Sequence, residues 1–175
     1  IDARRGKTSS TEEDIKALAK EIHSIPKDFT PHKRIQKIYN ERQESINDGK
    51  NIDWATAEAL AFATLLKDGY GVRLSGQDVG RGTFSHRHAV LYDQENEKRF
   101  VPLRHFRKEQ ALFEIVDSFL SEFGVLGFEY GYSQADPKTL VLWEAQFGDF
   151  SNGAQTIIDQ FITTGERKWL RMSGL

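Results

Sequence analysis

The sequence contains no cysteine, so disulfide bonds and thiolate metal sites are excluded, and a reducing compartment is compatible with it. It has no excess of one charge: 24 basic residues face 26 acidic ones, which argues against a nucleic-acid or membrane surface. No apolar run approaches the roughly 18 residues that span a bilayer, and no signal peptide is visible. These absences leave a globular chain of 175 residues, which is long enough to bury a real core.

The first fifty residues (1–50) are interpreted as a basic arm followed by a helical connector. Ser10 and Glu13 form a capping-box pattern, and apolar residues then recur at helical spacing to about His23. Two prolines break this helix, and a second, charged helix is predicted over residues 34–46. The two helices are expected to form a strut that carries no site.

Two isolated histidines lie in this connector. His23 and His32 stand among lysines and glutamates, without a second ligand at metal-binding spacing. Both are therefore interpreted as surface residues without chemistry.

The remaining residues (51–175) read as an α/β domain. Asp53 can cap a helix over 54–67, and a strand is expected over 70–74. Residues 139–144 contain Leu, Val, Leu and Trp in succession without alternation, which is typical of a parallel strand covered on both faces, and a helix should follow from about residue 152 to 161. We expect a three-layer α/β sandwich, with a mostly parallel sheet and helices on both faces, preceded by the helical connector.

A glycine-containing apolar helix is predicted to begin at Glu122. Aromatic and aliphatic residues occur on nearly every side of it, which indicates a buried helix. Gly124, Gly127 and Gly131 each cost about 1 kcal/mol relative to alanine, so another element should approach them closely. A carboxylate at the start of such a helix can cap it, pair with a cation or perform acid–base chemistry, and capping is the default.

Further candidate residues follow the ends of the predicted strands, where α/β proteins bind ligands. Gln77 and Asp78 follow the first strand and either face a ligand or simply form a turn. Phe147 and Phe150 follow the strand at 139–144, where they are either core residues or a stacking surface for a flat ring.

Two histidines flank an arginine in the sequence Ser-His-Arg-His. On a strand, His86 and His88 would share one face and could bind a metal, but a third ligand is missing. They could instead meet an anionic ligand or donate protons near neutral pH, or pack as polar loop residues against a neighbouring domain.

Several long strings resemble one enzyme family. They are SGQDVGRGTFSHRHAVLYDQ, SEFGVLGFEYGYS, LWEAQFGDFSNGAQTIIDQFI and GERKW. Together they resemble the pyrimidine-binding, transketolase-like domain of the thiamine-dependent decarboxylating subunit of the 2-oxoglutarate dehydrogenase complex. The resemblance runs from about Ile52 to Leu175, and the missing initiator methionine and the abrupt end lead us to expect a fragment of a longer chain.

The resemblance implies a thiamine diphosphate site. Glu122 would share a proton with the aminopyrimidine ring, because a carboxylate in a pocket of low dielectric constant has a raised pKa. Phe147 and Phe150 would stack on that ring, Phe147 being preferred, and Gln77 and Asp78 would face the cofactor. The sequence contains neither a Walker-type loop nor the family's metal-binding pattern, so the ligands of magnesium and of the diphosphate should lie outside this chain.

The resemblance also implies a function for the whole subunit. It would be a homodimer that decarboxylates the 2-oxo acid 2-oxoglutarate and passes the succinyl group to a lipoyl-bearing succinyltransferase core, in a bacterial cytoplasm or a mitochondrial matrix. Two alternatives remain open, namely the paralogous 2-oxoadipate dehydrogenase and, for the fragment alone, an inactive dimerisation or docking module. The anionic ligand that His86 and His88 could meet would then be the 2-oxo acid, and the Ser-His-Arg-His string favours 2-oxoglutarate.

Overall fold

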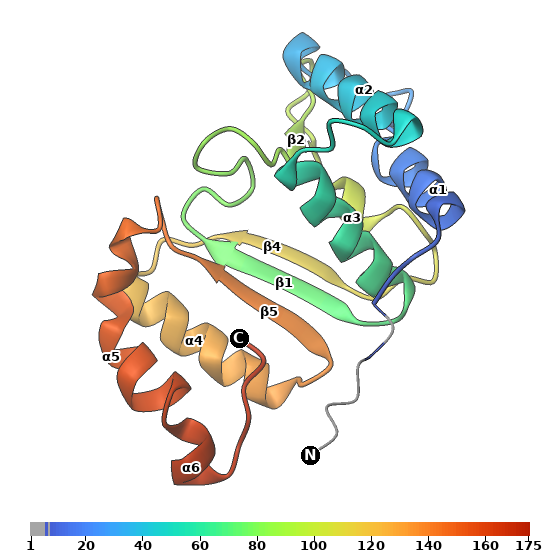
Figure 1. Cartoon of the computed structure of the whole chain (residues 1–175). Helices are drawn as coiled ribbons and strands as arrows, with labels where there is room; N and C mark the ends of the chain where they lie inside the picture. The colour runs from blue at the N-terminus through green and yellow to red at the C-terminus, as the bar shows by residue number, and fades with distance from the viewer. Residues whose placement is uncertain (1–5, 7) are drawn as a thin grey trace.

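A computed structural model describes residue 6 and residues 8–175, so the basic arm falls largely outside the described residues. At its centre lies a three-stranded parallel sheet in the order β4 (Phe113–Asp117), β1 (Gly71–Gly76), β5 (Thr139–Glu144). Helices flank the sheet on both sides (Figure 1). The expected three-layer α/β architecture with a parallel sheet and a preceding helical connector is therefore confirmed.

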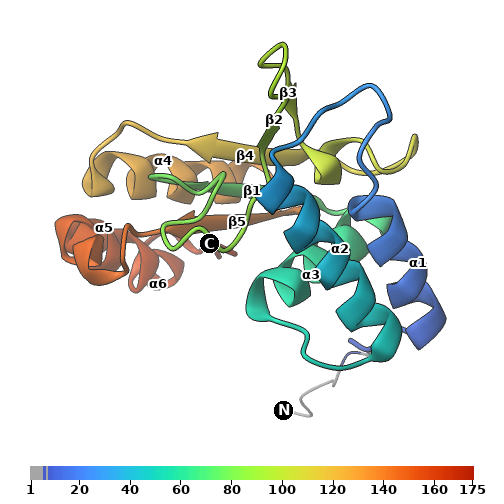
Figure 2. The same cartoon turned by 90° about the horizontal axis from the view of Figure 1, so that it is seen from above.

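The first helical layer consists of α3 (Trp54–Lys67) against the sheet, with α1 (Glu12–Ile22) and α2 (Lys33–Asp48) outside it. Figure 2 shows the three helices gathered on one side. Successive residues of a strand point to opposite faces, so Val72 and Leu74 of β1 enter the same core as Phe62 and Leu66 of α3. The buried members of this core are Leu18, Ala19, Ile22, Ile46, Leu60, Phe62, Ala63, Leu66, Val72, Leu74, Val79, Val101, Leu103, Phe113 and Ile115. The connector helices thus share the main core with the domain.

The second helical layer begins with α4 (Glu122–Ala135), which packs on β1 and β5. The predicted helix over about 152–161 is a succession of a 3₁₀ helix, η2 (Asp149–Ala154), a short α5 (Gln155–Ile157) and a π-helix, η3 (Ile158–Ile162); α6 (Gly165–Trp169) follows. A small antiparallel pair, β2 (Leu91–Tyr92) with β3 (Arg99–Phe100), and the 3₁₀ turn η1 (Pro102–Arg104) complete the fold.

The prediction that α4 is buried on nearly every side is wrong in detail. Phe123 and Phe128 are 51% and 54% exposed, whereas the charged Glu129 is only 1% exposed. Its carboxylate accepts hydrogen bonds from Nε and Nη2 of Arg73, at 2.8 and 3.0 Å. Arg73 lies on β1 between Val72 and Leu74, so the α4 face of the sheet carries a buried ion pair.

The strand β5 is also less covered than its apolar run predicted. It lies at one edge of the sheet, and only Val141 is fully buried. The run of Leu, Val, Leu and Trp is therefore typical of the strand but did not reveal its edge position.

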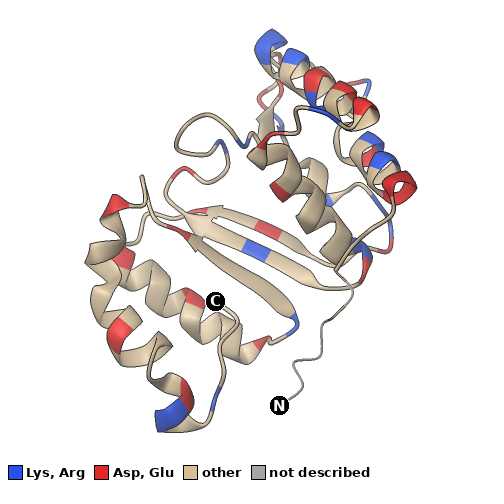
Figure 3. Cartoon of the chain, in the orientation of Figure 1, with Lys and Arg blue, Asp and Glu red and all other residues tan. Residues whose placement is uncertain are grey.

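The helix starts follow local hydrogen-bonding chemistry. Asp53 caps α3 through the amide of Thr56, as predicted, whereas α1 is capped by Thr11 rather than Ser10. The charged residues concentrate on α1 and α2 (Figure 3). No helix in the described part of the chain is long and apolar enough to cross a membrane.

His23 contradicts the expectation of a surface histidine. Its ring packs edge-on against Tyr39, with the ring centroids 5.3 Å apart, and its Nδ1 lies 2.9 Å from the carbonyl oxygen of Ala19. The other nitrogen, Nε2, is buried without a partner. Burial lowers the pKa of His23 to about 4, since this environment disfavours the charged ring.

We expect His23 to make the fold sensitive to acid. Its ring titrates near 6.5 in an unfolded chain, so its neutral form contributes stability that is complete above pH 6.5 and is lost as the pH falls through about 4. That loss should approach about 3 kcal/mol at pH 4. Urea unfolding of wild type and His23→Phe at pH 7 and pH 4 should show a smaller pH dependence for the variant, whereas His32→Gln should behave as wild type. Equal pH dependence of wild type and His23→Phe would contradict this role.

Candidate functional site

Glu122 lies where β1, α4 and η2 meet, at the carboxyl end of the sheet. It is the first residue of α4, which Ser121 caps by accepting a hydrogen bond from the amide of Gly124. The Nε2 of Gln77, just past β1, donates to Glu122 Oε1 at 3.3 Å. The structure therefore brings together two of the residues that the sequence singled out from segments 45 residues apart.

A glycine of η2 lets the chain approach Glu122 closely. A Cβ at Gly153 would lie 3.2 Å from both the Cβ and Oε2 of Glu122. Glu122 is half-buried rather than sunk in the apolar interior, so within this chain its carboxylate remains partly accessible.

Three aromatic side chains stand beyond the end of β5. Phe147 packs edge-on against Phe84, with centroids 5.8 Å apart, and its ring lies 6.3 Å from that of Phe150. All three rings are at least half exposed, at 54%, 71% and 50% respectively. The sequence drew attention to Phe147 and Phe150, but it missed Phe84, which comes from a segment more than sixty residues earlier.

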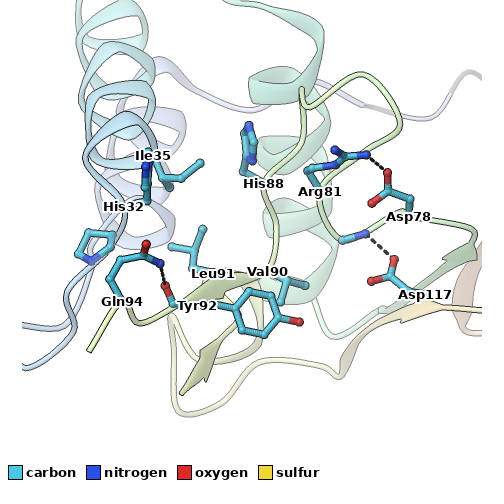
Figure 4. Close-up of a pocket in the computed structure, with 12 residues that line it drawn as sticks. His32, Ile35, Asp78, Arg81, His88, Val90, Leu91, Tyr92, Gln94 and Asp117 are labelled. Carbon is cyan, nitrogen blue, oxygen red and sulfur yellow. Dashed lines mark hydrogen bonds and ion pairs between the residues drawn. The ribbon is translucent and has the colours of Figure 1, made fainter. Parts of the chain in front are cut away.

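Asp78 turns away from Glu122. Its carboxylate pairs with Arg81, and its backbone adopts a left-handed conformation with φ of 59°. With Arg81, His88 and Asp117 it lines a cavity of about 380 Å³ between the segment after β1 and the start of α2 (Figure 4). Gln77 and Asp78 are thus adjacent in sequence, but their side chains contact different residues, Glu122 and Arg81 respectively.

His86 and His88 belong to an irregular β1–β2 loop, residues 77–90, and not to a strand. His86 and His88 therefore do not share one face of a strand, the geometry on which the possible metal site depended. The His86 ring packs over Gly82, where a Cβ would lie only 2.5 Å from His86 Cε1. His88 borders the cavity, and burial lowers its pKa from the ordinary value.

The arginine between these histidines is a second residue that sequence reasoning overlooked. Arg87 is 6% exposed, and its guanidinium donates to Glu58 of α3 and to Glu144 at the end of β5. Burial opposes its charge, but hydrogen bonds to Glu144 and Glu58 outweigh that effect and raise the pKa of Arg87. Glu144, the last residue of β5, anchors this loop. The sequence signal for this ion pair was Glu144, a charged residue at the end of an otherwise apolar strand.

Comparison with known proteins identifies the family. The family model described as transketolase, pyrimidine binding domain, matches residues 50–175. The 2-oxoglutarate dehydrogenase E1 component of Brucella canis is 58% identical over 174 residues, covering 99% of this chain and 17% of the relative. That of Brucella melitensis biotype 2 is 57% identical over the same length, with the same coverage. The chain thus spans about a sixth of these relatives, and it belongs to the family of transketolase pyrimidine-binding domains.

Proposed function

We propose that this chain is the pyrimidine-binding part of a thiamine-diphosphate-dependent 2-oxoglutarate dehydrogenase. The observation that carries the proposal is Glu122 at the start of α4, beside the Gln77 amide and on the same sheet end as the exposed rings of Phe147 and Phe150. The relatives named 2-oxoglutarate dehydrogenase E1 component support the choice of substrate. Because they are bacterial, we include a bacterial cytoplasm in the proposal.

The residues present fit an aminopyrimidine. Such a ring offers a weakly basic nitrogen at its edge and a flat face, and the site offers a partly accessible carboxylate and exposed aromatic surface. The Oε1 of Glu122 already accepts a hydrogen bond from Gln77. Its Oε2 remains available to accept one from a protonated ring nitrogen.

Glu122 acts in this proposal as a proton carrier. When bound, thiamine diphosphate supplies the carbanion chemistry that cleaves a 2-oxo acid. A companion domain that covers Glu122 would remove water from its carboxylate, so that one proton could be shared with the ring nitrogen. Gln77 orients the carboxylate by its hydrogen bond, and the capped helix start keeps the carboxylate at the sheet end.

The aromatic residues position the ring. Phe147 is the preferred stacking residue because its ring is half exposed just beyond the end of β5, and Phe84 supports it from the side. Phe150 extends the same surface. Asp78 is assigned to the cofactor environment through the β1–β2 loop in which it lies, since its own carboxylate is paired with Arg81.

The diphosphate and magnesium are assigned to a companion domain outside this chain. Among the residues that the structure describes, no group of three or more histidine or acidic side chains is arranged to hold a metal ion. The half-exposed Phe123 and Phe128 beside the α4 glycines support a homodimer contact, because neither Gly124 nor Gly131 is tightly covered within this chain. The assembled subunit would deliver its product to a lipoyl-bearing succinyltransferase core.

Two measurements test the proposal. The full-length subunit should turn over 2-oxoglutarate faster than 2-oxoadipate, and the opposite preference would select the alternative enzyme. Calorimetry with thiamine diphosphate and Mg²⁺ should show tight binding to the full-length subunit and feeble binding to the 175-residue chain. Failure of the full-length subunit to bind thiamine diphosphate would leave only a dimerisation or docking role.

A further inference from the structure

The β1–β2 loop is held from outside the family domain by α2. Nη2 of Arg42 donates to the carbonyl oxygen of His86 at 2.5 Å, and its Nη1 donates to that of Arg87 at 3.1 Å. The hydroxyl of Tyr39, one turn earlier on α2, donates to the carbonyl oxygen of His88 at 2.8 Å. Three successive carbonyl groups are thus taken up by two side chains of one helix. Figure 1 shows the segment after β1 running toward α2 before it enters β2.

These two side chains are buried, although α2 is mostly charged and exposed. Tyr39 is 4% exposed and Arg42 is 6% exposed, and the Arg42 guanidinium carbon lies 5.7 Å from the centre of the Tyr39 ring. The described partners of the Arg42 guanidinium are carbonyl oxygens and not carboxylates. Hydrogen bonds from a charged donor are stronger than those between neutral groups. Because the Arg42 guanidinium donates to the loop backbone, we infer that it stabilises the conformation of the loop.

The loop needs such support because its backbone is strained. Ser85 and His88, neither of them glycine, have φ of 53° and 51°. A left-handed backbone is unfavourable for residues of this kind and persists only where the surroundings enforce it. The carbonyl groups that Arg42 and Tyr39 bind are the three that follow Ser85, the last of them being that of His88 itself.

The other side of the loop reaches the proposed site. Arg87 joins the loop to α3 and to the end of β5 through Glu58 and Glu144. Two residues past that end, Gln146 accepts a hydrogen bond from Thr83 Oγ1 at 3.0 Å. Phe84 then stands edge-on against Phe147. The loop therefore connects α2 to the exposed rings of Phe84, Phe147 and Phe150, so that a shift of α2 would move these rings.

We propose that Arg42 is a positioning residue for the cofactor site, acting through the β1–β2 loop, with Tyr39 as its partner. The family match begins at residue 50, so this role falls to a residue of the preceding connector. The inference deepens the proposed function and rests on it. Its physical core, that Arg42 holds the loop, is independent of which cofactor or substrate the site takes.

The test uses the full-length subunit with Arg42→Lys, and Tyr39→Phe as a milder second variant. The ammonium group of lysine cannot reproduce the planar guanidinium, which donates to two carbonyl groups at once. Tyr39→Phe removes only one hydroxyl and its single hydrogen bond. Amide hydrogen exchange reports the loop directly, because the amides of Arg87 and His88 bond to the carbonyl of Arg81, and that of Ala89 bonds to Gly80. We expect their exchange to accelerate about tenfold or more in both variants, while β1 and α3 exchange as in wild type.

Kinetics separate positioning from loss of folding. We expect the KM for thiamine diphosphate to rise about tenfold in Arg42→Lys, with kcat at saturating cofactor nearly unchanged. Displacement of the Phe84 and Phe147 rings would weaken cofactor binding but would leave Glu122 in place. Lys33→Met, which removes an exposed cation from the same helix, should match wild type in both measurements. Unchanged loop exchange in both variants would overturn the proposal, as would accelerated exchange with an unaltered KM. If the wild-type subunit does not bind thiamine diphosphate, the proposed function fails, and the exchange data still decide whether Arg42 holds the loop.

Discussion

Replacing Glu122 with glutamine in the full-length subunit is expected to lower turnover of 2-oxoglutarate by about a hundredfold to ten-thousandfold, the usual contribution of a positioned proton carrier. Glutamine keeps the size and the carbonyl oxygen that Gln77 contacts, but it cannot release or share a proton. It also remains compatible with the first turn of α4, because Ser121 supplies the cap. The loss should therefore appear in kcat, while folding and dimerisation remain largely intact.

The measurement is steady-state turnover with thiamine diphosphate and Mg²⁺ present in excess, together with thermal unfolding of the same preparations. Glu166→Gln is the matched control, since Glu166 occupies the first turn of α6 and is exposed. Its turnover should equal that of wild type. Wild-type turnover by Glu122→Gln would remove Glu122 from the mechanism.

Replacing Arg73 with methionine is expected to lower the free energy of unfolding of this chain by about 3–5 kcal/mol, the cost of leaving one partner of a buried ion pair alone. Arg73 has 11% of its side chain exposed and Glu129 has 1%. The guanidinium also contacts Glu114 at 3.3 Å and lies 4.7 Å from the centre of the Tyr132 ring. The hydrogen bonds to Glu129 raise the pKa of Arg73. Without the guanidinium, the Glu129 carboxylate would be buried and uncompensated.

Urea unfolding of the 175-residue chain, followed by circular dichroism, gives this free energy. The double variant Arg73→Met/Glu129→Leu should recover most of the loss, because an apolar pair of similar volume replaces two charges. Arg171→Met, at an exposed position, should change stability by less than about 0.5 kcal/mol. A loss below about 1 kcal/mol for Arg73→Met would mean that the pair is solvated in the folded chain.

The sequence showed the elements because their signals are local. The capping residue Asp53, the apolar run at 139–144 and the helix beginning at Glu122 each depend on neighbours a few residues away. The long family strings likewise require no knowledge of contacts. From these signals the three-layer α/β architecture and the family could be predicted, and the structure and the comparisons confirm both.

Only the tertiary structure decided which charges are buried and what they hold. The ion pair of Arg73 with Glu129 joins residues 56 apart, and the bonds from Arg42 reach residues 44 and 45 away. Nothing in the local pattern distinguishes such an arginine from a solvated one, because burial of a charge becomes favourable only when a distant partner arrives with it. For the same reason His23 is half-buried, with its Nε2 fully enclosed, where its neighbours predicted exposure. The sequence by itself determined where helices and strands form, and the packing of distant segments determined which charged side chains shape the sheet end around Glu122.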